Sequence, residues 1–340
     1  MSVRVVSDSE VRVLLPVADC VEVMAEALAT LARGEAVLPL RSMVWLPDRR
    51  GLLGLMPSYL GSPAAIGLKV VTVMPGNHGT EFDSHQGAVL VFETGHGSLR
   101  AIVDASSITA IRTAAVSALG TRLLAREDAG DLAILGSGVE AATHLEGMRA
   151  VRALRRVRVW SRTPAHAQAF ARREGARLGL RVEPVASARE AVAGADLVCT
   201  VTSSREPVLR GEWLAPGAHV NAVGACFANA RELDTAAVAR ARLFVDRRES
   251  TLNEAGDFLI PREEGAIGND HIQAEIGEVL TGAKPGRSGR EEITLFKSLG
   301  LAVEDLAAAH HAWERAEATG AGTEIELGGR RVAAAEAPES

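Results

Sequence analysis

The chain has 340 residues, of which 47% are hydrophobic and 24% are charged, and its formal net charge at pH 7 is −6. This length suffices for two domains that each bury a core. Acidic and basic residues are interspersed and aromatic residues make up only 4%, so the composition argues against a nucleic-acid-binding protein and against a protein that docks on a membrane surface.

The cysteines and the N-terminal residues narrow the expected location. Cys20, Cys199 and Cys226 are too far apart to suggest a disulfide framework or a set of metal ligands. Residues 1–15 carry scattered charges and lack the apolar core of a signal peptide, and no other run is apolar enough to cross a bilayer. We therefore expect a cytoplasmic protein without a metal centre.

The first part of the chain reads as a helix, then strands, then a second helix. Pro16 opens the first helix, which Gly34 ends after apolar residues at helical spacing. The runs that follow have no long helix between them, which predicts an antiparallel or mixed sheet. Ser106 and Ser107 are expected to cap an alanine-rich helix that reaches about Arg126. The expected strands are residues 40–46, 52–56, 66–73, 87–92 and 99–103.

From Asp131 the pattern changes to strands that alternate with helices, which predicts a doubly wound parallel sheet. Further helices are expected at residues 272–280 and 295–318, and the second of these is expected to pack back on the first domain. The predicted fold class is α/β, with a Rossmann-type sheet in residues 119–304 and an α+β domain in residues 1–118 plus 305–340. The expected parallel strands are 132–135, 157–160, 181–185, 197–202, 218–223 and 243–245.

Residues 131–142 follow the G-x-G-x-x-(G/A) pattern between an expected strand and an expected helix. In this pattern Gly136 allows a tight turn, Gly138 lets the backbone approach a pyrophosphate, and Ala141 lets helix and strand pack closely. The N–H groups at the helix start would bind the anion. A glycine turn without a ligand is the alternative. The expected dinucleotide contacts here are Gly136, Ser137, Gly138, Val139, Glu140 and Ala141.

The next expected strand ends at Ser161-Arg162-Thr163, where NAD-preferring folds usually carry an acid for the ribose 2′-hydroxyl. Two hydroxyls and an arginine suit a 2′-phosphate instead. These three residues therefore predict a preference for NADP(H) over NAD(H), although an exposed loop arginine without a ligand would look the same. Thr202, at the end of a later strand, joins the expected cofactor contacts.

Three cations of the first domain lie in or beside apolar segments: Arg41, Lys69 and Arg112. A cation in such a segment must reach solvent or find an anionic partner. Together they could bind a substrate carboxylate, but structural ion pairs explain buried cations equally well.

A series of short motifs runs through both halves of the chain, and in this order they resemble the ornithine cyclodeaminase/mu-crystallin family. The resemblance covers nearly the whole length. The motifs are Met56-Pro57, Gly67-Leu68-Lys69, Ser84-His85-Gln86-Gly87, residues 108–115, Gly136-Ser137-Gly138, residues 221–225, Arg231-Glu232-Leu233-Asp234, residues 296–300 and Glu304-Asp305.

The resemblance implies a homodimeric NAD(P)-dependent enzyme that acts on a small amino or imino acid. It implies that the first domain and the C-terminal helix form the dimer and hold the substrate. By the same resemblance, Arg41, Lys69 and Arg112 bind the substrate carboxylate. Lys69 and Arg112 are the catalytic residues, and Lys69 donates or relays the proton at the reacting nitrogen. Further cofactor contacts implied by the resemblance are Ser84, Thr113, Val223, Gly224 and Ser298.

Two positions depart from the family pattern. Cys226, assigned to the substrate site, stands where ornithine cyclodeaminase has an aspartate that acts on the substrate amine. Glu140 replaces the glutamine that usually follows the second glycine. The missing aspartate favours a reductase of cyclic ketimines such as Δ1-pyrroline-2-carboxylate or Δ1-piperideine-2-carboxylate. Ornithine or lysine cyclodeamination, reductive amination of a 2-keto acid, and ligand binding without turnover remain alternatives.

Overall fold

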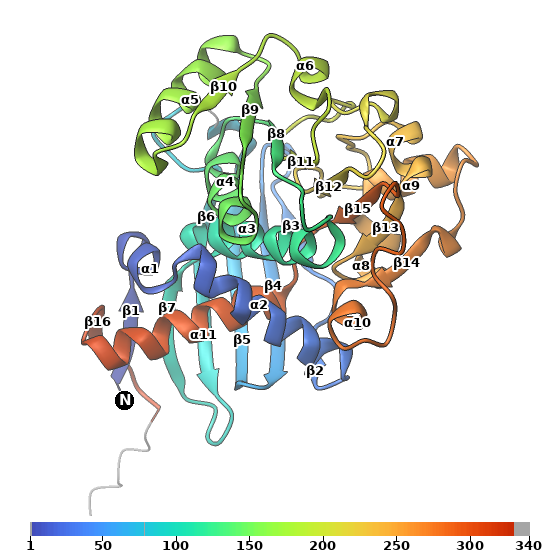
Figure 1. The fold of residues 1–340 in the computed structure, drawn as a ribbon. Helices are drawn as coiled ribbons and strands as arrows, with labels where there is room; N and C mark the ends of the chain where they lie inside the picture. The colour runs from blue at the N-terminus through green and yellow to red at the C-terminus, as the bar shows by residue number, and fades with distance from the viewer. Residues whose placement is uncertain (1, 78, 330–340) are drawn as a thin grey trace, which may run out of the picture.

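The computed structural model describes residues 2–77 and 79–329, and two sheets are formed in them: one from strands of residues 2–104 together with 323–326, the other from strands of residues 131–297 (Figure 1). The first sheet has the order β16-β1-β7-β6-β5-β4-β2, with β3 paired to β4. It is mixed as predicted, because β1 runs parallel to β7 and the other pairs are antiparallel. Its strands are β1 (Ser2–Val6), β2 (Ala36–Val37), β3 (Ser42–Trp45), β4 (Leu52–Gly61), β5 (Ala64–Val73), β6 (His85–Glu93), β7 (Leu99–Asp104) and β16 (Thr323–Glu326).

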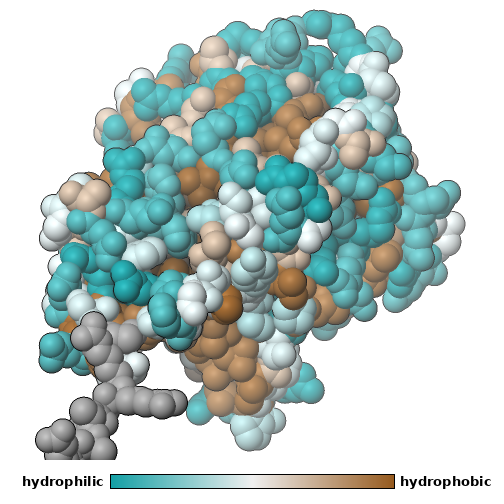
Figure 2. All heavy atoms as spheres, turned by 90° about the horizontal axis from the view of Figure 1, so that it is seen from below, coloured by the Kyte–Doolittle hydropathy of each residue, from teal (hydrophilic) through white to brown (hydrophobic). Residues whose placement is uncertain are grey.

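Helices cover one face of this sheet and leave the other open. The covering helices are α1 (Asp8–Leu14), α2 (Val17–Ala32), α3 (Ala105–Leu124) and α11 (Ala302–Thr319). Figure 1 shows α2 and α11 crossing the sheet. Buried and exposed residues alternate along β4 and β5, so alternate side chains point away from the helices. On that side of the molecule Figure 2 shows a hydrophobic surface.

The start of α3 differs from the expectation. Ser106 and Ser107 do not cap it, because Asp104 is the N-cap residue and its carboxylate accepts the Ser107 backbone N–H at 2.8 Å. An aspartate satisfies the free N–H groups of the first turn as well as a serine does. The helix therefore begins at Ala105, before both serines.

The second sheet is parallel throughout, with the order β10-β9-β8-β11-β12-β15-β13-β14. This confirms the predicted doubly wound fold. Its strands are β8 (Asp131–Leu135), β9 (Arg156–Trp160), β10 (Val182–Pro184), β11 (Leu197–Thr200), β12 (His219–Ala222), β13 (Arg242–Val245), β14 (Ile272–Glu275) and β15 (Thr294–Lys297). Its helices are α4 (Val139–Val151), α5 (Pro164–Leu178), α6 (Ala188–Val192), α7 (Thr235–Arg240), α8 (Arg248–Glu254), α9 (Gly256–Glu263) and α10 (Ile276–Leu280), with short 3₁₀ turns at Pro75–Asn77, Gly211–Trp213 and Asn269–His271.

Two of the predicted helices were wrong in their first turns. Residues 272–275 and 294–297 are strands, and β15 lies between β12 and β13 inside the sheet. A short apolar run reads alike as a buried strand or a buried helix, so periodicity could not separate the two. The helix α11 starts only at Ala302, after Gly300 with φ +78° has turned the chain. The chain therefore passes from the sheet to α11 within a few residues.

Helix α3 joins the two halves. It crosses the expected domain boundary at residues 118/119 and packs against α2, α4 and strands of both sheets. The division into residues 1–118 plus 305–340 and 119–304 stays a prediction, and residues 330–340 lie outside the described part of the chain. Among the described residues, no helix has the length and apolar character needed to cross a membrane.

Candidate active site

The residues expected to contact a dinucleotide follow the carboxyl ends of neighbouring parallel strands. Pairing aligns Trp160, Leu135, Thr200, Ala222 and Lys297 across the sheet. Ligands of doubly wound folds bind at this edge. The expected contacts that lie just beyond these strand ends are Ser161, Arg162, Thr163, Gly136, Ser137, Gly138, Thr202, Val223, Gly224 and Ser298.

The glycine turn has the geometry that its pattern predicts. Gly136 has φ +129°, and a Cβ there would lie 2.7 Å from the carbonyl oxygen of Val201, so only glycine fits. Gly138 is the N-cap residue of α4, and a Cβ there would meet no atom within 4 Å. Ala141 is fully buried, and Val139 is 56% exposed at the helix start. The open N-terminus of α4 can therefore receive a phosphate group.

Glu232 fixes the neighbouring edge of the site. Its carboxylate accepts the Thr202 N–H and hydroxyl at 2.6 Å each and the Gly224 N–H at 2.7 Å. A side chain at Gly224 would collide with the Thr202 backbone. Val223 and Ser298 are buried, and the Ser298 hydroxyl has no partner within the described chain. Glu232 thus holds two of the expected contacts in place.

Lys69 and Arg112 meet at one carboxylate. The Lys69 Nζ donates to Oδ1 of Asp305 at 3.0 Å, and the Arg112 Nε donates to the same oxygen at 2.9 Å. Arg112 also donates to Glu304 at 3.1 Å, and Lys69 donates to the Thr109 hydroxyl at 2.6 Å. Lys69 on β5, Arg112 on α3 and the two acids on α11 are all buried.

Arg41 lies beside this cluster without sharing its acids. It donates to the carbonyl oxygens of Leu299 and Gly300 at 3.0 Å and pairs with Glu254 at 3.0 Å. Asp246 accepts the N–H of Gly300 at 2.8 Å. A Cβ on Gly300 would lie 2.5 Å from the Arg112 guanidinium. Arg41 and Arg112 therefore flank the same short segment that leads into α11.

Burial and pairing shift the pKa values in this cluster in opposite directions. Burial lowers the pKa of Lys69, and Asp305 offsets part of that effect. Burial raises the pKa of Glu304 to about 8 although Arg112 opposes it. Burial also acts to raise the pKa of Asp305, but Arg112 and Lys69 outweigh it, so the net pKa is lowered. The cluster thus combines a carboxyl group that favours its ionised form, one that favours its protonated form, and a lysine that releases its proton more readily than usual.

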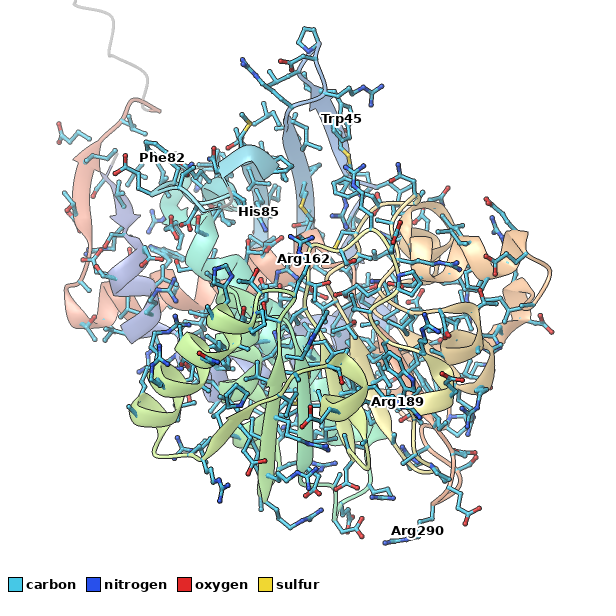
Figure 3. The ribbon with its side chains drawn as sticks, turned by 90° about the horizontal axis from the view of Figure 1, so that it is seen from above. Trp45, Phe82, His85, Arg162, Arg189 and Arg290 are labelled. Carbon is cyan, nitrogen blue, oxygen red and sulfur yellow. The ribbon has the colours of Figure 1, made fainter. Side chains whose placement is uncertain are left out.

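The remaining expected residues surround this cluster. The Ser84 hydroxyl contacts Nδ1 of His85 at 3.0 Å, and Thr113 is buried next to Arg112 on α3. The Cys226 thiol donates to the Val223 carbonyl at 3.4 Å, and burial raises its pKa. In Figure 3, His85 lies on the first half of the chain and Arg162 on the facing side of the second. The thiol is not activated as a nucleophile or base.

Sequence reasoning missed the acids that hold the cations. Glu304 and Asp305 were recognised only as a motif, and Glu254 and Asp246 were not singled out. A signal was available: two adjacent acids stand at the start of an alanine-rich helix whose first residues are buried. Buried charges need partners, so these acids pointed to buried cations.

Comparisons with known proteins identify one family along almost the whole chain. The model of the ornithine cyclodeaminase/mu-crystallin family matches residues 2–320. The chain is 45% identical over 286 residues to the ketimine reductase mu-crystallin of Mus musculus, covering 83% of this chain and 87% of the relative.

Two solved structures have nearly the same fold. One is the Δ1-pyrroline-2-carboxylate reductase of Thermococcus litoralis in complex with NADH and L-proline, with a TM-score of 0.92, 38% identity, and coverage of 95% of this chain and 100% of that chain. The other is an archaeal alanine dehydrogenase dimer with bound NAD, with a TM-score of 0.90, 30% identity, and coverage of 96% and 100%.

Proposed function

Because the chain belongs to the ornithine cyclodeaminase/mu-crystallin family, we propose that it is an NAD(P)H-dependent reductase of cyclic ketimine carboxylates, with Δ1-pyrroline-2-carboxylate and Δ1-piperideine-2-carboxylate as the expected substrates. The observation that carries the proposal is that Lys69 and Arg112 both donate to Asp305. Asp305 follows the end of β15 and Ser298 by only a few residues. One short segment therefore joins the cations expected to bind the carboxylate to the edge of the sheet expected to bind the dinucleotide.

The three cations divide into two roles in this reaction. Arg112 and Arg41 bind the substrate carboxylate, since guanidinium groups form parallel charge-assisted hydrogen bonds with it. Lys69 protonates the imine nitrogen, and its lowered pKa makes it a better acid than an exposed lysine. A reduced nicotinamide held at the carboxyl edge of the second sheet would supply the hydride for the imine carbon.

The dinucleotide fits the residues at the carboxyl edge. The free space at Gly138 and the open helix N-terminus suit a pyrophosphate, and the unpartnered Ser298 hydroxyl offers a further polar contact. Arg162 is exposed and has no hydrogen-bond or ion-pair partner in the described part of the chain. We propose that it binds the 2′-phosphate, so that NADP(H) is preferred over NAD(H).

Cys226 favours reduction over cyclodeamination. A cyclodeaminase must deprotonate an amine whose pKa is near 10.4, and a positioned base contributes roughly 10²–10⁴-fold to such a step. The Cys226 thiol is half-buried, and burial raises its pKa, so it is a poor base. A ketimine reductase needs no base at this position because its substrate already contains the C=N bond.

We further propose that a second copy of the chain covers the outer face of the first sheet. Alternate residues of β4 and β5 present apolar side chains there, and Tyr59 and Ile66 are 37% and 46% exposed. Figure 2 shows this hydrophobic surface. Large exposed apolar patches usually mark interfaces, and the archaeal relative is described as a dimer.

The function is tested by mixing the pure protein with NADPH and each cyclic ketimine and following cofactor oxidation. L-Ornithine and L-lysine with NAD⁺ are assayed in parallel for ammonia release. Reduction of the ketimines without ammonia release is expected. Ammonia release without ketimine reduction would establish cyclodeamination instead, and cofactor binding without either reaction would establish a binding protein.

A further inference from the structure

A buried lysine that has no part in the proposed reaction lies behind the expected cofactor edge. Lys297 is the last residue of β15, and its side chain is 1% exposed. It is not one of the three cations expected at the substrate. A charge this deep in a protein is costly unless it has partners. The groups that contact Lys297 therefore indicate what its charge is used for.

The partners of Lys297 are one carboxylate and two backbone carbonyl groups. Its Nζ pairs with Oδ2 of Asp257 on α9 at 3.1 Å. It also donates to the carbonyl oxygen of Ala225 at 2.7 Å and to that of Ala222 at 3.3 Å. Burial acts to lower the pKa of Lys297, but Asp257 and other acidic groups outweigh burial, so the net pKa is raised. Lys297 is therefore an ammonium group that donates hydrogen bonds and is not a base.

Asp257 connects this lysine to Glu232, the acid that fixes the neighbouring edge of the site. Oδ1 of Asp257 accepts the backbone N–H of Glu232 at 2.8 Å. The Glu232 carboxylate accepts the Gly224 N–H at 2.7 Å. Lys297, Asp257 and Glu232 are all buried. Through these three side chains the carbonyl group of Ala225 is linked to the N–H group of the residue before it.

The segment that these contacts hold consists of residues 223–226, which follow β12 at the carboxyl edge of the second sheet. The segment belongs to no helix or strand. It contains the expected cofactor contacts Val223 and Gly224 and the expected substrate contact Cys226. A group that fixes this segment therefore fixes the cofactor side and the substrate side of the site relative to each other.

The two ends of the segment are held by different groups. The N–H groups of Val223 and Gly224 donate to the carbonyl oxygen of Thr200 on β11, at 3.0 Å and 3.2 Å. The carbonyl oxygen of Ala225 has Lys297 as its only hydrogen-bond partner within the described chain. Loss of the lysine would therefore release the end of the segment that leads away from the sheet, while the end next to β12 stays in place.

We propose that Lys297 is a positioning residue for hydride transfer: it holds the carbonyl group of Ala225 and thereby keeps residues 223–226 where the nicotinamide and the imine carbon meet at reacting distance. This inference rests on the proposed function, in which a reduced nicotinamide reduces a ketimine. In this role Lys297 touches neither reactant and exchanges no proton. The rate depends steeply on such geometry, because a displacement of about 1 Å can cost roughly 10²-fold.

Two variants separate the hydrogen bond to the segment from the ion pair. Asp257→Asn removes the charge that pairs with Lys297, but the amine can still donate to Ala225, and the Asn oxygen can still accept the Glu232 N–H. Lys297→Met/Asp257→Asn removes the amine as well, so that neither member of the ion pair is left buried alone. The two variants differ only at residue 297, and their comparison therefore isolates the hydrogen bonds of the lysine.

A control variant tests the loss of a buried charge elsewhere in the same half of the chain. Glu174 is a buried acid of α5 that pairs with Arg173 and Arg177 of the same helix. Glu174→Gln removes this charge and leaves residues 223–226 untouched. Its rate of hydride transfer should therefore match that of the wild type.

Single-turnover kinetics provide the measurement. The protein, loaded with one equivalent of NADPH, is mixed with saturating Δ1-pyrroline-2-carboxylate or Δ1-piperideine-2-carboxylate, and the NADPH absorbance is followed by stopped flow. The amplitude gives the fraction of active sites, and the rate constant gives the speed of hydride transfer. A purely structural role would lower the amplitude through partial unfolding and leave the rate constant of the folded molecules unchanged.

Lys297→Met/Asp257→Asn is expected to have a rate constant roughly 10- to 100-fold below that of Asp257→Asn, with the amplitude retained. Equal rate constants in these two variants, or a loss of amplitude alone, would overturn this inference and leave the proposed function standing. Failure of the wild type to oxidise NADPH with either ketimine would overturn the proposed function and this inference with it.

Discussion

The Lys69 ammonium donates to Oδ1 of Asp305 at 3.0 Å, and both groups are buried. Asp305 also accepts from Arg112, so the acid gathers the two cations before any substrate is present. A substrate carboxylate that binds Arg112 must share this donor with Asp305 and Glu304. Binding is therefore easier when Glu304 is protonated, which connects substrate affinity with pH.

Lys69→Met should lower kcat by roughly 10²–10⁴-fold even at saturating substrate, because the substitution removes the group assigned to proton transfer. Steady-state ketimine reduction with NADPH is the measurement. Lys284→Met, at an exposed lysine, serves as the control and should retain the wild-type rate. A Lys69→Met variant that folds and keeps kcat would remove Lys69 from the chemistry.

Arg41→Ala should raise KM more than it lowers kcat, since the carboxylate stays charged from substrate to product. A charge-assisted hydrogen bond contributes about 1.5–3 kcal/mol, or about ten- to a hundredfold in affinity. Arg50→Ala, at an exposed arginine paired with Asp48, should leave both constants unchanged. A decrease of kcat alone would show that Arg41 acts in the transition state rather than in binding.

The fold class could be predicted from the sequence because it depends on local patterns, and the same patterns place the expected dinucleotide contacts at one edge of the sheet. Alternating strands and helices around Gly136 and Gly138 are visible in a single segment, and the family that the motifs indicated is confirmed over residues 2–320. The pairing of Lys69 with Asp305 joins residues 236 positions apart, and no local pattern predicts such a contact. Residues 295–297 were misread because a central strand is apolar on both faces and has no period of two.

Glu304→Gln should change how stability depends on pH. The folded protein raises the pKa of Glu304 from an ordinary 4.5 to about 8. Between these values the folded state holds a proton that the unfolded state releases, so the free energy of unfolding falls as pH rises. The fall is at most about 1.4 kcal/mol per pH unit. Urea unfolding from pH 5 to pH 8 should show this slope in the wild type and a smaller one in Glu304→Gln. Identical slopes would mean that Glu304 is ionised throughout.

Ile66→Glu should convert the proposed dimer into a monomer, because a carboxylate on the open face of the first sheet cannot be buried against a second copy without a partner. Light scattering after gel filtration should give about twice the chain mass of 35.7 kDa for the wild type and the single mass for the variant. Val13→Glu, at a 75% exposed residue of α1 on the helical side, is the control. A wild-type monomer would contradict the proposed interface.

Arg162→Asp should narrow or reverse the preference between NADPH and NADH. The guanidinium has no partner within the described chain and follows β9, next to the strand that carries the glycine turn. It can therefore bind a 2′-phosphate without first breaking an ion pair, whereas an aspartate would repel the phosphate and accept a ribose hydroxyl. Fluorescence titration should give the wild type about ten- to a hundredfold tighter binding of NADPH, from the roughly 1.5–3 kcal/mol of a charge-assisted pair. Arg189→Asp is the matched control, because it makes the same change of charge in the same half of the chain. Arg189 lies well apart from Arg162 in Figure 3. Equal dissociation constants of the wild type for the two cofactors would show that Arg162 does not select the 2′-phosphate.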